Sequence, residues 1–239
     1  MALEHDHSPQ AIRARLGADT RPNYLRDWVY GGIDGAVTTF AIVAGVVGAD
    51  LAARIVVILG VANLFADGFS MAAANFSGTK TEVDDRARLV EIERRHIATV
   101  PEGEREEIRQ ILTRKGLGGR TLEGAVAAIT ASEKTWIDTM IAEEYGLAGA
   151  QRTPMTSGVS TFAAFVLAGA VPLVPFVLGV PRPFAWALGL VAIVFFAIGS
   201  VKSRWSLDSW WRSGLETLGI GLVAAAVAFG VGWILRGLG

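Results

Sequence analysis

Five mostly apolar stretches, each about 20 residues long, alternate with polar segments along the chain. They cover residues 28–47, 55–76, 156–178, 183–201 and 213–235. A stretch of this length can cross a bilayer as a helix, although it also suits a buried helix of a large soluble protein. Five of them in 239 residues favour the membrane, and 51% hydrophobic residues with a mean hydropathy of +0.41 agree. We therefore predict an all-α integral membrane protein with five transmembrane helices.

The segment between the second and third apolar stretches is polar and carries much of the charge. Residues 77–155 hold 14 of the 23 acidic and 12 of the 22 basic residues, and apolar residues recur there at helical spacing. Pro101 favours a helix start, Gly116 a helix end and Thr121 an N-cap. We predict three helices in this insert: one that extends the second span to about residue 100, one over 101–115 and one over 121–145.

Basic residues are unevenly distributed between the two ends of the predicted spans. One set precedes the first span or joins the fourth and fifth: Arg13, Arg15, Arg21, Arg26, Lys202, Arg204 and Arg212. The opposite ends carry Arg54, Arg182 and Arg236. By the positive-inside rule, the N-terminus and the insert are cytosolic and the C-terminus lies on the other side. Three tryptophans suit the aromatic belt at the inner interface: Trp205, Trp210 and Trp211.

One carboxylate, Asp34, interrupts the first apolar span. A lone ionised carboxylate in hydrocarbon costs several kcal/mol, so it needs a partner, a proton or water. The second span offers a polar stripe at steps of four residues: Asn63, Asp67, Met71 and Asn75. Carboxylate and amide oxygens suit divalent cations, and a thioether shifts the preference towards softer ones such as Fe²⁺. We predict that Asp34 and this stripe line a water-filled translocation path, with helix-to-helix hydrogen bonding as the competing interpretation.

Metal-ligating residue types also recur in pairs along the insert. The two members of each pair are three or four residues apart: Glu93 with His96, Glu104 with Glu107, and Met140 with Glu144. Side chains at this spacing lie on one helix face and can point together. Packing of the helices could join the pairs into one or more metal clusters, whereas a solvated charged surface is the competing interpretation. The chain has no cysteine, so its metal ligands are oxygen, imidazole or thioether.

These patterns divide the chain into four predicted parts. They are a cytosolic tail over 1–25, two membrane spans over 26–77, a cytosolic helical metal-binding domain over 78–152 and three membrane spans over 153–239. The tail has no apolar run and is not expected to be a cleaved signal peptide. Its His5 and His7 could bind a metal, but we favour a disordered polar tail.

The motifs that carry these residues resemble those of the vacuolar iron transporter family, which includes the yeast Ccc-type transporters and plant nodulin-like relatives. The resemblance covers nearly the whole chain. In the first two spans it rests on YGGIDGAVTTFAIVAGVVGA from residue 30 and ADGFSMAAANFSGTKTE from residue 66. In the insert it rests on EIERRHIATVPEGEREEI from residue 91 and WIDTMIAEEYGL from residue 136, and the last span reads SGLETLGIGLVAAAVAFGVG.

The resemblance implies a homodimer with five membrane helices per subunit. Such proteins carry Fe²⁺, and often Mn²⁺, out of the cytosol in exchange for protons, along a path between the first and second helices at the dimer interface. By motif position, Asp34 and Met71 would act on the ion in the membrane. The insert would collect metal through six residues: Glu93, His96, Glu104, Glu107, Met140 and Glu144.

The expected ligands follow from the same resemblance, and the composition indicates the location. Fe²⁺ would be a substrate, with Mn²⁺, Co²⁺ and Zn²⁺ as further candidates, and no cofactor would be permanently bound. The other partners would be protons, the lipid bilayer and a second copy of the chain, without nucleic acid or enzymatic activity. A composition rich in Ala, Gly and Arg favours a bacterial cytoplasmic membrane, whereas a eukaryotic chain would occupy the vacuolar membrane.

The sequence departs from the family at three positions. Most members carry a carboxylate where this chain has His96, many carry a glutamate where it has Asn75, and a sulfur is common where it has Ile141. Asp67, which lies deeper in the same span than Asn75, could replace the missing glutamate. Because imidazole must be deprotonated to bind a metal, His96 predicts binding that depends on pH near neutrality. Metal preference and the number of sites stay open.

Two other functions stay open at this point. The Glu93-x-x-His96 sequence matches a motif of ferritin-like di-iron sites, which would suit a membrane-anchored iron oxidase or store. Such sites need two of these motifs in a four-helix bundle, and this chain has one. The second alternative is a metal sensor that signals through the insert without transport. Consumption of O₂ would identify the first, and metal binding without flux would identify the second.

Overall fold

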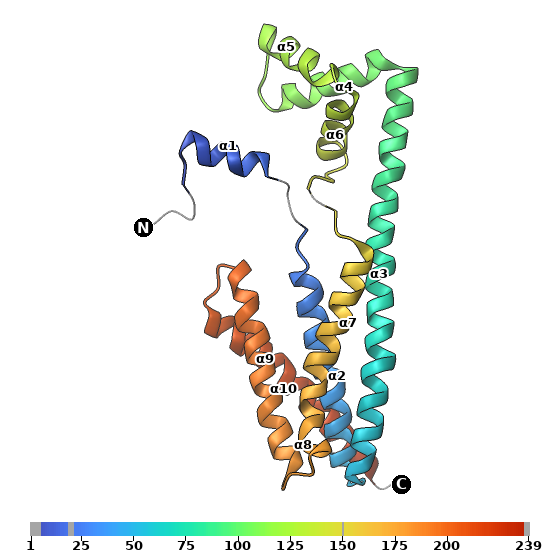
Figure 1. Ribbon diagram of the computed structural model, residues 1–239, viewed down its shortest axis with the longest axis vertical. Coiled ribbons are helices and arrows are strands. Elements are labelled where there is room, and N and C mark those ends of the chain that lie inside the picture. The colour runs from blue at the N-terminus through green and yellow to red at the C-terminus, as the bar shows by residue number, and fades with distance from the viewer. Residues whose placement is uncertain (1–5, 19–21, 150, 237–239) are drawn as a thin grey trace. The chain divides into compact units, whose positions relative to one another are not determined.

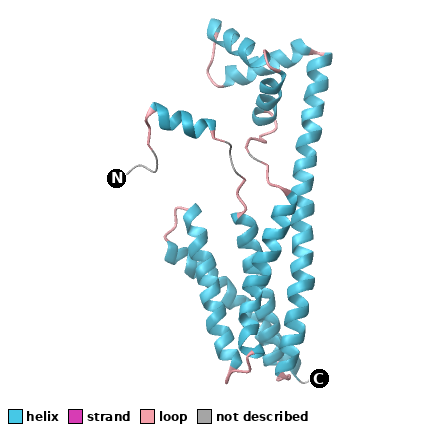
Figure 2. Ribbon diagram, viewed as in Figure 1, coloured by secondary structure: helices cyan, strands magenta, loops and turns pink. Residues whose placement is uncertain are grey.

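The computed structural model describes residues 6–18, 22–149 and 151–236, which form helices and loops and contain no strand (Figure 2). In chain order the elements are α1 (Pro9–Gly17), α2 (Leu25–Gly48), α3 (Ala53–Thr99), α4 (Pro101–Arg114), α5 (Gly119–Thr130), α6 (Glu133–Glu143), α7 (Pro154–Ala170), η1 (Val171–Leu173), α8 (Val174–Val177), α9 (Pro183–Lys202), η2 (Ser203–Trp205) and α10 (Trp210–Leu235) (Figure 1). Among the described residues, five helical runs are long and apolar enough to cross a membrane: Leu25–Gly48, Ala53–Thr99, Pro154–Val177, Pro183–Trp205 and Trp210–Leu235. The predicted all-α fold and its five spans are thereby confirmed.

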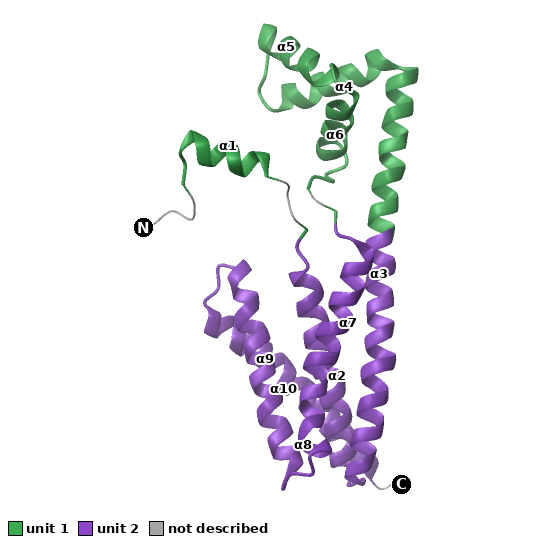
Figure 3. Cartoon of the chain, in the orientation of Figure 1, with its two compact units in different colours: residues 1–22, 81–151 green, residues 23–80, 152–239 purple. Residues whose placement is uncertain are grey.

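The chain forms two compact units (Figure 3). The insert unit contains Met1–Pro22 and Thr81–Gln151, and the membrane unit contains Asn23–Lys80 and Arg152–Gly239. Helix α3 contributes to both units, because the boundary between them falls within it. Each unit has an apolar core of its own.

In the membrane unit, helix α2 packs against α7, α9 and α10. Two glycines of α2 let the backbone of α7 come close. A Cβ atom on Gly31 would lie 2.3 Å from the carbonyl oxygen of Thr161, and one on Gly35 would lie 2.3 Å from that of Phe165. Small residues one turn apart commonly allow such approach between membrane helices. Asp34 directly precedes Gly35, so this tight packing fixes the position of its backbone.

The core and the outer surface of the membrane unit are both apolar. Phe40, Phe165 and Phe195, from three different spans, are among the largest fully buried side chains. Large apolar side chains also lie exposed, including Phe69 on α3 and Ile234 on α10. Without lipid, such a surface would be unfavourable in water, so it fits a unit embedded in a bilayer.

The third span differs from the continuous helix predicted over 156–178. Helix α7 ends at Ala170, and a 3₁₀ turn, η1, separates it from the single turn α8. Pro172 lies in the turn and Pro175 in α8. Each proline lacks a backbone N–H and crowds the preceding turn, which explains why the helix changes geometry here.

The insert unit follows the predicted helices up to α4 and then differs. Helix α3 ends at Thr99 and α4 begins at Pro101, as expected. The helix predicted over 121–145 is instead two helices, α5 and α6, because Ser132 starts a new helix by accepting a hydrogen bond from the Thr135 N–H at 3.4 Å. The prediction that Thr121 is an N-cap is also wrong. Gly118 occupies the N-cap position of α5.

The N-terminal tail contains a helix where we favoured disorder. Helix α1 covers Pro9–Gly17, with Pro9 at its first position. The hydroxyl of Ser8 caps it by accepting a hydrogen bond from the Ala11 N–H at 3.3 Å. His7 is exposed, and His5 lies outside the described residues, so the suggested metal pair stays a prediction.

Candidate metal centre

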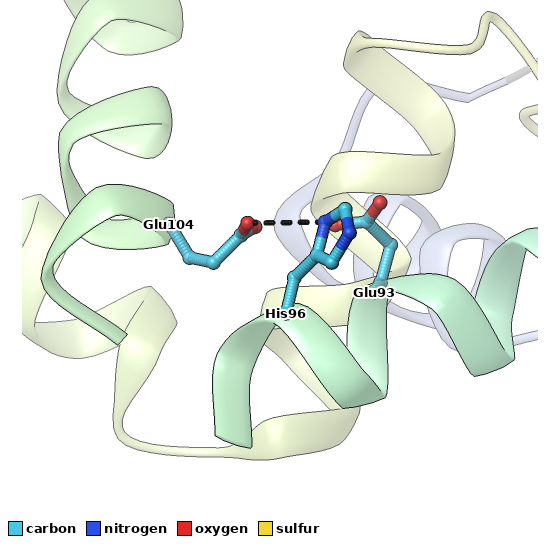
Figure 4. A group of neighbouring side chains, drawn as sticks. All are labelled: Glu93, His96 and Glu104. Carbon is cyan, nitrogen blue, oxygen red and sulfur yellow. Dashed lines mark ion pairs between the residues drawn. The ribbon is translucent and has the colours of Figure 1, made fainter. Parts of the chain in front are cut away.

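Three metal-ligating side chains of the insert unit converge where α3 ends and α4 begins. Glu93 and His96 lie one turn apart on α3, and Glu104 lies in the first turn of α4. Each offers one ligand atom, and these atoms all lie within 4.8 Å of one another. His96 Nδ1 is 3.4 Å from Oε1 of Glu104. Figure 4 shows the three side chains pointing towards one another.

A tight corner in the backbone produces this convergence. Only Val100 separates α3 from α4, and it leaves the helical conformation with φ −137° and ψ 60°. The Val100 N–H donates to the His96 carbonyl at 2.7 Å, which closes the last turn of α3. Pro101 then starts α4, where its missing N–H removes no helical hydrogen bond. The sequence His-x₃-Val-Pro therefore brings the first turn of α4 back to the last turns of α3.

The two carboxylates of the cluster are buried, and each has an oxygen without a donor. Glu93 is 1% exposed and Glu104 is 5% exposed, whereas the His96 side chain is 49% exposed. Among the described residues, Oε2 of Glu93 and Oε2 of Glu104 have no hydrogen-bond partner. Burial of an ionised carboxylate is unfavourable unless a donor, a proton or a cation compensates it. These two oxygens and the accessible imidazole therefore fit the ligand set of a divalent metal ion.

Two further predicted ligands lie close to this cluster. The carboxylates of Glu107 and Glu144 interact electrostatically with Glu104 and with each other. Both line a pocket of about 220 Å³, together with Gln110 and Glu143. The structure thus brings together five of the six residues predicted for the insert: Glu93, His96, Glu104, Glu107 and Glu144.

The sixth predicted residue, Met140, has different surroundings. Its side chain is fully buried in an apolar cluster with Ile108, Val126 and Trp136. A thioether in such a cluster serves packing, as methionine commonly does. A direct role of Met140 in metal binding stays a prediction.

Tyr145, which was not predicted as a site residue, contacts the cluster. Its hydroxyl donates a hydrogen bond to Oε1 of Glu93 at 2.8 Å. Burial, together with this bond and the nearby negative charges, raises the pKa of Tyr145, so the phenol keeps its proton. A group that donates to a ligating carboxylate fixes its orientation, as outer-shell residues do in metal sites. A buried Tyr hydroxyl usually finds a hydrogen-bond partner. The position of this tyrosine directly after Glu144 was therefore the sequence signal that could have indicated its contact with the cluster.

The cluster holds a proton near neutral pH when no metal is bound. Burial, followed by the negative charges of Glu107 and Glu93, raises the pKa of Glu104 from 4.5 to about 7. Burial and the charges of Glu93 and Glu107 also raise the pKa of Glu144. Because a ligating carboxylate must be deprotonated, a cation and a proton compete for Glu104 in this pH range.

The membrane stripe contains a second set of polar side chains. Asp34 on α2 and Asp67 on α3 are both partly buried, and their carboxyl groups are close enough to interact electrostatically. Asn63 donates to the Thr38 hydroxyl at 3.2 Å, and that hydroxyl donates to the Asp34 backbone carbonyl at 2.9 Å. Met71 packs at the edge of the apolar core. A role for these residues in translocation stays a prediction.

Asn75, the fourth member of the stripe, belongs to a separate buried network. Its side-chain amide lies 2.9 Å from Oδ1 of Asp27 and 2.7 Å from the hydroxyl of Thr161. Arg152 also donates to Oδ1 of Asp27, at 2.8 Å, and Asp27 is 1% exposed. The network joins the beginning of α2 to α3, to the middle of α7 and to Arg152, which precedes α7. Its contacts match the helix-to-helix hydrogen bonding that competed with the pathway interpretation. Asp27 and Arg152 were missed because no local spacing links them.

Comparison with known proteins connects these residues to one family. The sequence model of the VIT family matches residues 25–233. Vacuolar iron transporter 1 of Arabidopsis thaliana is 32% identical over 214 residues, which cover 88% of this chain and 85% of that protein. Vacuolar iron transporter 2 of Oryza sativa subsp. japonica is 32% identical over 217 residues, which cover 89% of this chain and 87% of that protein. The vacuolar iron transporter of Toxoplasma gondii is 31% identical over 230 residues, which cover 91% of this chain and 76% of that protein.

Removal of the Arg152 charge should destabilise the membrane unit. Asp27 is buried and would keep an uncompensated charge in Arg152→Gln, which we expect to cost about 3–5 kcal/mol of unfolding free energy. Arg236→Gln is the matched control, because Arg236 pairs with the exposed Asp50 and its loss should cost less than about 1 kcal/mol. Chemical unfolding of the purified full chain in detergent measures both. Equal effects of the two substitutions would contradict a structural role for the Asp27–Arg152 pair.

Removal of the Glu104 carboxyl group should stabilise the metal-free protein at high pH. The folded chain binds this proton up to about pH 7, whereas an unfolded chain releases it near 4.5. The unfolding free energy therefore falls as the pH rises between these values. We expect Glu104→Gln to match the wild type at about pH 5 and to exceed it by roughly 1–3 kcal/mol at about pH 8. Thermal unfolding of the full chain in detergent, followed by circular dichroism, measures the difference.

Glu123→Gln is the control for this pH effect. Glu123 is exposed and pairs with Arg109 at 2.9 Å, and this hydrogen bond lowers its pKa. Glu123→Gln should therefore gain no stability at about pH 8. If Glu104→Gln also gained none, the raised pKa of Glu104 would be contradicted.

Proposed function

The chain belongs to the VIT family, and from that premise we propose that it exports Fe²⁺ from the cytosol in exchange for protons. Membership of this family makes the chain a multi-pass membrane protein and a metal-ion transporter rather than an enzyme. The relatives' names specify iron. Mn²⁺ is a second candidate substrate, and the metal ion is cargo rather than a resident cofactor.

The two unpaired oxygens of Glu93 and Glu104 carry this proposal. They are buried beside the accessible imidazole of His96, and a cation would satisfy both. Carboxylate oxygen together with imidazole nitrogen is a donor set of borderline softness, which suits Fe²⁺ and Mn²⁺ better than Mg²⁺ or Ca²⁺. The nearby carboxylates of Glu107 and Glu144 add negative charge that attracts a divalent ion. The insert unit would therefore collect metal from the cytosol.

The membrane step of the proposal uses the carboxylates of Asp34 and Asp67. Two adjacent carboxylates in a medium of low dielectric constant require compensation. One divalent cation or a pair of protons can provide it, so successive occupation by the two would exchange metal for protons. Met71, one turn from Asp67, would add a thioether that favours Fe²⁺ over harder ions. A proton arriving from the far side would release the metal outward.

A homodimer is part of the proposal, and the surface of α3 supports it. Phe65 and Phe69 are 58% and 68% exposed, and Asp67 lies between them in the sequence with a partly exposed side chain. A carboxylate in a membrane span faces protein or water rather than lipid. A second copy covering this part of α3 would enclose Asp67 and complete a polar path. The excess of basic residues beside α2 and α9 supports a cytosolic N-terminus and insert.

Transport by purified protein in vesicles tests the assignment. Fe²⁺ uptake is measured in proteoliposomes with an imposed pH gradient, and Mn²⁺, Co²⁺ and Zn²⁺ are compared in the same assay. Loss of an outer-shell group at a metal site typically weakens metal affinity or activity by about tenfold or more, and loss of a direct ligand should have at least as large an effect. We therefore expect the initial rate of Fe²⁺ uptake to be roughly tenfold lower, or lower still, in Asp34→Asn and in Met71→Ala.

Two substitutions of the same kind serve as controls for transport. Asp50→Asn removes an exposed carboxylate paired with Arg236, and Met155→Ala removes a methionine that is 63% exposed. Both should transport at the wild-type rate. The translocation role would be wrong if Asp34→Asn and Met71→Ala were as fast as these controls. Metal binding without uptake by the wild type would instead indicate a sensor.

A further inference from the structure

A groove in the membrane unit lies between the beginning of α2 and the end of α9. Its volume is about 310 Å³, which is at the lower end of the range of about 300–1,000 Å³ for small-ligand sites. Leu25 and Val29 contribute apolar surface, Tyr30 and Trp205 contribute aromatic rings, and Arg26 and Lys202 contribute positive charge. We call this the interfacial groove. Its lining includes no residue of the insert cluster and neither Asp34 nor Asp67.

The two cations of the groove are available to an anion. Arg26 lies over the Tyr30 ring at 5.3 Å from its centroid and forms no ion pair with the residues that the structure describes. Lys202 is 3.5 Å from the carboxylate of Glu216, and both side chains are substantially exposed. Such an exposed pair is weak and can exchange partners. An anion entering the groove can therefore contact both cations at little cost.

Residues around the groove favour the headgroup region of a membrane. The connection between α9 and α10 carries Arg204 and Asp208, and the first two turns of α10 carry Arg212 and Glu216. Three tryptophans there are exposed: Trp205, Trp210 and Trp211. Arg212 lies over the Trp211 ring at 5.2 Å. Tryptophan and tyrosine gather at headgroup level, where one end of the side chain is apolar and the other is wet.

We propose that the interfacial groove binds the phosphate headgroup of an anionic glycerophospholipid. Arg26 and Lys202 contact the phosphate, and arginine suits this role because its donors match phosphate oxygens. Leu25 and Val29 contact the glycerol and the upper acyl chains. Basic pockets between membrane helices bind anionic headgroups in this way. A free phosphate would make the charge contacts alone, so the apolar part of the groove favours the lipid.

Native mass spectrometry of the full chain tests the lipid site. The detergent-solubilised protein is titrated with dioleoylphosphatidylglycerol or dioleoylphosphatidylcholine. One basic side chain near an anionic headgroup contributes about fivefold in affinity. We therefore expect Arg26→Gln with Lys202→Gln to bind phosphatidylglycerol about 25-fold more weakly than the wild type. Arg54→Gln with Arg182→Gln makes the same charge change at the opposite ends of the spans, and it should stay within about twofold of the wild type.

Further arms of the experiment distinguish the alternatives. Phosphatidylcholine should bind more weakly than phosphatidylglycerol, and raising NaCl from about 50 to about 300 mM should weaken binding of phosphatidylglycerol to the wild type. The salt titration uses the wild-type protein alone, so its result does not depend on whether the variants fold correctly. Equal loss in the two double variants would overturn the site. Displacement of the lipid by an equal concentration of inorganic phosphate would overturn its assignment to lipid, as would equal binding of the two lipids.

Discussion

A buried carboxylate must have a compensating charge, and this constraint governs both units of the protein. Glu93 and Glu104 meet at the corner between α3 and α4 with one oxygen each that lacks a donor. Burial and the surrounding negative charges raise the pKa of Glu104 to about 7, so a proton compensates it when no metal is present. A divalent cation can take the place of that proton. The corner itself depends on Pro101, which starts α4 directly after α3 ends.

The membrane unit compensates one of its carboxylates permanently and leaves two others without a permanent partner. Asp27 has a permanent partner, because Arg152 and Asn75 both donate to its Oδ1. Asp34 and Asp67 have each other, and two negative charges do not compensate one another. A fixed ion pair holds helices together, whereas an uncompensated pair of acids is free to exchange cations for protons. This contrast separates the structural carboxylate from the two that we propose to be functional.

Sequence alone could predict those features that depend on local pattern. The spans follow from length and hydropathy, the α3–α4 corner follows from Pro101, and the approach of Glu93 to His96 follows from helical spacing. The features that were missed depend on contacts across the fold or on weak local signals. The hydrogen bond from Tyr145 to Glu93 joins residues 52 positions apart. The break at Ser132 rests on a single capping hydroxyl, which competes with an otherwise helical sequence.

Metal binding at the Glu93–Glu104 pair is tested most directly by X-ray absorption spectroscopy of the tag-free full chain loaded with one equivalent of Co²⁺. The spectrum should show oxygen ligands and the outer-shell scattering of one imidazole. Since the chain has three histidines, His96→Gln identifies the source of that scattering. We predict that His96→Gln loses the imidazole signal and that Glu93→Gln with Glu104→Gln abolishes stoichiometric binding. An unchanged imidazole signal in His96→Gln, or full occupancy without the two carboxylates, would contradict a metal site at this corner.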